Sequence, residues 1–239
     1  MSEPLYKNLV PVRSSHADLH FHHRNDCPHL QRITTVPIAS VEFGALAGAL
    51  PIVWHRGEAG LEPLALTGLL PGFGTLLATG TIADSIPLLI LSYPFGAPHY
   101  DGTQERVAVM LDQPPVAADA VAHAVFDDKL ALRPEADTAI RALYVYLSDR
   151  QRTLALSQAL DEAGGLTAWR NRIVFDDAVT EIGDLWVCKT GFEATEAYGR
   201  LIAQHGPHMA MLIECHRASL QHFGRLARRL SGSAQGGQH

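Results

Sequence analysis

The hydrophobic period of the chain changes near residue 136, and this change constrains the fold most. After it, apolar residues recur at helical spacing through ADTAIRALYVYLSDRQRTLALSQALDEAGG at 136–165. Before it, short apolar runs alternate with glycine and proline, which is typical of buried strands and turns. Those runs are PIVWH at 51–55, PLALTGLL at 63–70, IPLLILSYPF at 86–95 and RVAVML at 106–111. The sequence therefore predicts an α+β fold, with mixed short strands in the N-terminal half, a helical middle segment and a C-terminal helix packed on them.

Local signals place the individual elements. Ser40 can cap a short helix that has Glu42 in its first turn. The middle segment reads as one long helix or a helical hairpin that ends at Gly164. Strands are expected in RNRIVFDD at 170–177 and DLWVCKTGF at 184–192, and a terminal helix in HMAMLIECHRASLQHFGRLARRL at 208–230.

Length and charge limit the organisation and the partners. With 239 residues and 47% hydrophobic content the chain can bury a substantial core, and we expect one globular domain over residues 1–230. The small polar residues of the tail, 231–239, predict disorder. A formal charge of −6 lacks the basic footprint of a nucleic-acid-binding protein, so we expect no nucleic acid partner.

Cysteine usage and the N-terminus favour the cytoplasm. The three cysteines are odd in number and have no CxxC spacing, which fits a reducing compartment. The first 20 residues lack the charged and apolar regions of a secretory signal, so surface association would need a non-classical export route. The apolar run at 86–98 is interrupted by prolines and falls short of the roughly 20 residues that a membrane helix needs, so we expect no integral membrane segment.

Several short motifs occur in an order that resembles the SapC family. They are YKNLVPV at 6–12, VPIASVEFGALAGALPIVW at 36–54, PLALTGL at 63–69, IADSIPLLILSYPF at 82–95 and LIECHRASLQHFGRL at 212–226. The residues that match the pattern are Tyr6, Lys7, Asn8, Val36, Pro37, Glu42, Phe43, Pro51, Ile52, Val53, Tyr93, Pro94, Phe95, His216, Ser219 and Leu220. The resemblance covers most of the chain and implies an accessory or binding role in a surface-layer, uptake or peptide-modification system.

The stretch HADLHFHHRNDCPH at 16–29 concentrates five of the 13 histidines beside two aspartates and a cysteine. A metal needs several imidazoles, thiolates or carboxylates that converge in a defined geometry. If the stretch is helical, His16 and His20 share a face, and if it is extended, His20 and His22 do so. With Asp18 or Asp26 these histidines form a candidate iron or zinc site of two histidines and one carboxylate. The alternative is a solvated loop.

Aromatic and polar residues elsewhere suggest a binding pocket. Trp54, Tyr93 and Phe95 end apolar runs and could meet at one pocket rim, although core packing is the more common reason for such residues. His216 and Ser219 lie three apart on the terminal helix, where they could touch. Without an acidic partner or a GxSxG motif this pair does not predict a hydrolase, and its alternative role is to anchor the helix.

Two functions follow from these patterns. The first is a cytoplasmic binding or accessory protein that recognises a peptide or protein partner and needs no cofactor. The second is a metal-dependent enzyme, such as a peptide or amino-acid oxygenase, that uses the N-terminal histidines and aspartates. A structural surface-layer component is a third interpretation, which requires self-assembly and export.

Overall fold

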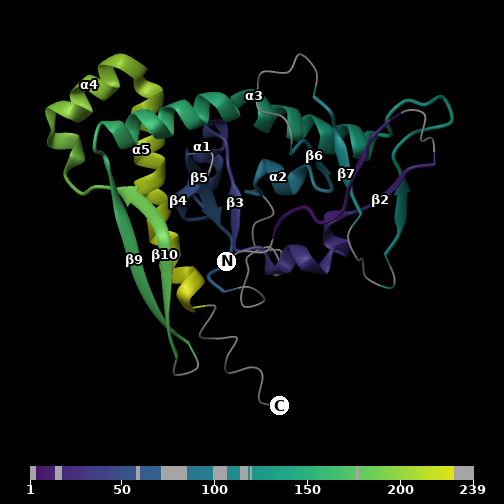
Figure 1. Ribbon diagram of the computed structural model, residues 1–239, viewed down its shortest axis with the longest axis horizontal. Helices are drawn as coiled ribbons and strands as arrows, with labels where there is room; N and C mark the ends of the chain where they lie inside the picture. Colours follow the sequence, from purple (N-terminus) through teal and green to yellow (C-terminus); the bar gives the residue numbers. More distant parts are fainter. Residues whose placement is uncertain are drawn as a thin grey trace.

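The computed structural model describes residues 4–13, 18–57, 60–70, 85–98, 107–113, 118, 120–175 and 178–228. Helix α3, Pro134–Glu162, runs across the whole molecule (Figure 1). It is one long helix, and Gly164 follows its end with a positive φ of 69° that favours glycine, which agrees with the end expected from the sequence. The α+β fold predicted from the sequence is confirmed.

Three sheets are present in the described parts of the chain. The largest is antiparallel, with the order β3-β5-β4-β10-β9, from Thr35–Pro37, Gly60–Leu66, Ile52–Gly57, Ala178–Cys188 and Leu166–Phe175. A smaller sheet has the order β1-β7-β6, from Leu9–Pro11, Met110–Asp112 and Phe95–Gly96. The third pairs β2, His20–His22, with β8, Ala122–Ala124.

The remaining elements are helical. The α-helices are α1, Phe43–Ala47, α2, Leu88–Leu91, α4, Glu196–His205, and α5, Pro207–Ser219. Short 3-10 turns are η1, Arg24–Asp26, η2, Pro28–Arg32, η3, Ser40–Glu42, η4, Phe192–Ala194, and η5, Leu220–His222. The helix expected over 208–230 is thus α5 and η5, with helical residues continuing at 223–228.

Two hydrophobic clusters lie along α3. The C-terminal core contains the large sheet, α1, α4 and α5, and α3 contributes Leu156 and Leu160 to it. The N-terminal core contains β2, β7, α2 and the segments around them, and α3 contributes Leu143 and Leu147. In Figure 1 the strands of the large sheet lie below the left part of α3, and β7 and β2 lie by its right part.

Two local expectations are corrected by the structure. The run at 86–95, expected to form buried strands and turns, instead forms the helical turn α2 at Leu88–Leu91, where Leu89 and Ile90 are buried, before β6 begins at Phe95. Ser40 lies inside η3 and not at its cap, since its hydroxyl donates to Asp149 Oδ2 at 2.7 Å. The capping function falls to Glu42, whose carboxylate accepts the Ala39 N–H at 2.7 Å.

Candidate functional site

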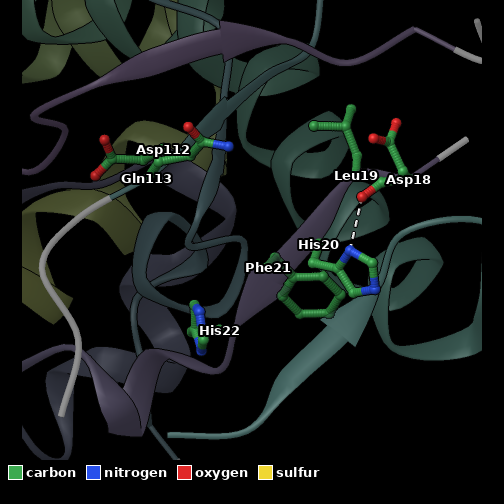
Figure 2. A pocket seen from close by; sticks show the side chains of 7 residues that line it. All are labelled: Asp18, Leu19, His20, Phe21, His22, Asp112 and Gln113. Atoms are coloured by element: carbon green, nitrogen blue, oxygen red, sulfur yellow. Dashed lines mark hydrogen bonds between the residues drawn. The ribbon is translucent and has the colours of Figure 1, made fainter. Parts of the chain in front are cut away.

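A cavity of about 470 Å³ lies between β2 and the end of β7 (Figure 2). Its lining consists of Asp18, Leu19, His20, Phe21, His22, Asp112 and Gln113. The cavity therefore joins three residues of the histidine stretch, predicted as metal ligands, to two residues about 90 positions later. Sequence reasoning missed Asp112 and Gln113, and the only local signal for them is a polar pair that ends an apolar run.

Pairing with β8 fixes how the histidines face. Phe21 is opposite His123, points into the N-terminal core and packs on Phe95 with ring centroids 5.3 Å apart. Since side chains alternate along a strand, His20 and His22 share the other face. The extended alternative for this stretch is the one found. In Figure 2 the rings of His20 and His22 lie apart, on either side of Phe21.

One edge of β2 pairs with β8, and the other edge has no strand partner among the residues that the structure describes. The Val125 N–H donates to the Leu19 carbonyl oxygen at 2.9 Å, so the backbone groups of Leu19 and Phe21 face β8. In an antiparallel pair the intervening residues point their N–H and C=O groups the other way. Those of His20 and His22 consequently face away from β8, and they have no hydrogen-bond partner among the residues that the structure describes.

Asp112 is a buried carboxylate at the opposite side of the cavity, with only 2% of its surface exposed. Its Oδ1 accepts the backbone N–H groups of Lys7 and Asn8 at 3.0 and 2.6 Å, and its Oδ2 accepts the Tyr93 hydroxyl at 2.7 Å. Burial, followed by the hydrogen bond to Asp112, raises the pKa of Tyr93. The YKN and YPF motifs, separate in the sequence, therefore meet on this one carboxylate.

The predicted metal ligands are placed as follows. His20 Nδ1 donates to the Asp18 carbonyl oxygen at 2.6 Å, which leaves its Nε2 as the acceptor nitrogen. His22 Nδ1 is a buried atom without a hydrogen-bond partner in the described parts of the chain. Asp26 ends η1 and is not part of the cavity lining, whereas His16 lies outside the described residues. Among the described residues no three histidine, cysteine, aspartate or glutamate side chains converge as a metal site.

The residues predicted to form a pocket rim are separated and buried. Trp54 is 0% exposed in the C-terminal core, while Tyr93 and Phe95 are 3% and 0% exposed in the N-terminal core. Trp54 Nε1 donates to Ser157 Oγ at 3.0 Å. The structure thus does not bring these aromatic residues together, and their burial favours the alternative of core packing.

His216 and Ser219 bind the backbone of Ile52. His216 Nδ1 donates to the Ile52 carbonyl oxygen at 2.7 Å, and its Nε2 accepts the Cys188 N–H at 3.1 Å. Ser219 Oγ accepts the Ile52 N–H at 2.9 Å. The fully buried pair therefore holds α5 on the large sheet, and this arrangement matches the anchoring alternative.

The two strands held by His216 explain the position of its ring. In the antiparallel pair of β4 and β10, Trp54 lies opposite Trp186. If this register continued by two residues, Ile52 would lie opposite Cys188. The imidazole stands between these two residues in place of a direct backbone bond. Burial, and to a smaller extent the charge of Arg217, lowers the pKa of His216 to about 4.

Comparison with known proteins identifies one match. A sequence model described as SapC matches residues 12–226. No curated protein and no solved structure matches the chain. Among the described residues, none of the helices combines the length and apolar character needed to cross a bilayer.

Proposed function

From the premise that this chain belongs to the SapC family, we propose that it is a binding or accessory protein that recognises an extended peptide segment of a partner. The proposed binding site is the open edge of β2 in the cavity that Asp112 and Gln113 complete. We further propose that residues 1–230 act as one domain in the cytoplasm, within a surface-layer, uptake or peptide-modification system.

One observation carries this proposal. The N–H and C=O groups of His20 and His22 point away from β8 along an edge that lines a cavity, and within the described chain they are unpaired. Unpaired strand edges are costly, and proteins usually cover or charge them unless they serve for pairing. An added strand supplies hydrogen bonds from its own backbone, so affinity depends little on the partner's side chains.

Substitution of His22 by proline is expected to weaken peptide binding. Proline removes the outward N–H, and its ring obstructs an added strand, whereas the bonds to β8 come from Leu19 and Phe21. The measurement is selection of heptapeptides from a random display library, followed by titration of a selected peptide. We expect binding at least about tenfold weaker in His22→Pro.

His22→Ala is the matched control, because it removes the imidazole and keeps the backbone N–H. It should bind the selected peptide like the unsubstituted protein. Equal peptide affinity in His22→Pro, with an unchanged melting temperature, would exclude the β2 edge as the binding site. Failure of the library to yield any binder to the unsubstituted protein would argue against the function itself.

The metal-dependent enzyme is the second candidate, and two features of the histidine side chains favour it. The Nδ1 of His20 is anchored on a backbone carbonyl, which is how ligating histidines are usually oriented. The Nδ1 of His22 is buried without a partner among the described residues. To hold iron or zinc, these two residues would need a third ligand; of the candidates, Asp18 lines the same cavity, Asp26 does not, and His16 lies outside the described residues.

Elemental mass spectrometry of untagged protein separates the two candidates. Peptide recognition by the β2 edge requires no metal, so we expect no stoichiometric iron or zinc after purification. Near one equivalent per chain, lost in a His20→Ala, His22→Ala variant that keeps its fold, would make the enzyme the leading function. Both imidazoles lie on the face away from Phe21, so the double variant should leave the core intact.

A further inference from the structure

The charged groups that line the cavity carry a single sign. Asp18 and Asp112 contribute carboxylates, and no lysine or arginine belongs to the lining formed by the described residues. Asp18 is exposed at the rim, whereas Asp112 is almost completely buried. A ligand that enters this cavity therefore meets a carboxylate at the rim and a second carboxylate in the interior.

Asp112 retains capacity to bind a further donor. Within the described parts of the chain its three hydrogen bonds come from two backbone N–H groups and a tyrosine hydroxyl, all of which are uncharged. A carboxylate offers about four acceptor positions, so one remains, on Oδ2. A cationic donor at that position would add a charge-assisted hydrogen bond, which is stronger than a bond between neutral groups.

The register of an added strand determines which of its side chains reaches Asp112. An antiparallel strand that exchanges hydrogen bonds with His20 and His22 places its intervening residue opposite Phe21. Side chains that lie opposite each other project from the same face of a sheet. Phe21 and Asp112 both belong to the lining of the cavity, so a side chain placed beside Phe21 enters the space that Asp112 borders.

We infer that the segment bound by β2 carries a basic side chain, lysine or arginine, opposite Phe21, where it reaches the carboxylate of Asp112. This inference rests on the proposed function, since it names the chemistry of the peptide that the β2 edge takes. The peptide's backbone supplies the bonds to His20 and His22, and its basic residue supplies selectivity.

Three matched heptapeptides test the inference by isothermal titration calorimetry. Each has blocked ends and alternates threonine with valine, and the central residue is lysine, glutamine or glutamate. The lysine peptide should bind about tenfold more tightly than the glutamine peptide, and the glutamate peptide most weakly. The preference should decrease with added salt, because screening weakens charge interactions.

Gln113→Lys provides the variant that keeps the fold, because the Gln113 side chain is exposed and its backbone N–H alone bonds Asn8. A positive charge at this position should abolish the preference for the lysine peptide over the glutamine peptide, and a preference retained in this variant would overturn the inference. Equal binding of the lysine and glutamine peptides to the unsubstituted protein would overturn the inference and leave the proposed function standing. If none of the three peptides binds, both fail.

Discussion

Replacement of His216 by alanine is expected to lower the free energy of unfolding by about 4 kcal/mol. The substitution leaves the Ile52 carbonyl and the Cys188 N–H without their partners at a fully buried position. It also removes a ring that packs on Trp54 with centroids 4.6 Å apart. Chemical denaturation at pH 7 measures the loss.

Gln221→Ala is the matched control, since Gln221 lies five residues later in the same helical segment and is exposed. It should change the free energy of unfolding by less than about 0.5 kcal/mol. If His216→Ala were as mild as this control, the imidazole would not connect β4 to β10.

The effect of His216→Ala should also depend on pH. Burial lowers the pKa of His216 to about 4 in the folded protein, against an ordinary value of 6.5. The unfolded chain therefore binds the extra proton between these pH values, and the stability contributed above pH 6.5 is lost as the pH falls toward 4. The difference between His216→Ala and the unsubstituted protein should decrease by about 2 kcal/mol from pH 7 to pH 4.5.

The unsubstituted protein and His216→Ala must be compared at each pH, because the stability contributed by Glu42 has the opposite pH dependence. Burial raises the pKa of Glu42 to about 7, so its contribution is largest below pH 4.5 and is lost as the pH rises through 7. This contribution is present in both proteins and cancels in the difference. If the difference in unfolding free energy between the unsubstituted protein and His216→Ala stayed constant from pH 7 to pH 4.5, His216 would not be buried in its neutral form.

Asp112→Ala should destabilise the N-terminal core by about 3 kcal/mol. It removes the acceptor for the Tyr93 hydroxyl, which is buried, and for the backbone N–H groups of Lys7 and Asn8. Water can reach these two N–H groups in part. Thermal unfolding and near-ultraviolet circular dichroism report on the stability and on the tyrosine environment. Gln113→Ala, at the exposed neighbouring position, should alter neither, and an equally mild Asp112→Ala would show that Asp112 does not hold the YKN segment.

The spacing of apolar residues and the positions of glycine and proline were sufficient to predict several helices and strands. The apolar spacing after residue 136 and the glycine at 164 predicted one long helix or a helical hairpin, and the structure shows the long helix α3. The alternating runs likewise predicted β4 and β5. These predictions succeeded because each depends on burial of one face by residues close together in sequence.

Contacts between distant segments could not be predicted from the sequence. Asp112 binds groups more than 100 residues away, and β2 pairs with β8 across a similar separation. No local period encodes such partners, so the histidine stretch left both its helical and extended alternatives open. The strand expected at Leu88–Leu91 failed for a related reason, since a short apolar run does not separate a buried strand from a buried helical turn.

Amide hydrogen exchange at His20 and His22 tests the central claim most directly. We expect both amides, which face away from β8, to exchange rapidly in the free protein and to become protected when a heptapeptide selected for binding is added at saturation. The Phe21 amide, which faces β8, should be protected in both states and serves as the internal reference. Unchanged exchange at His20 and His22 in the saturated complex would contradict peptide recognition by the β2 edge.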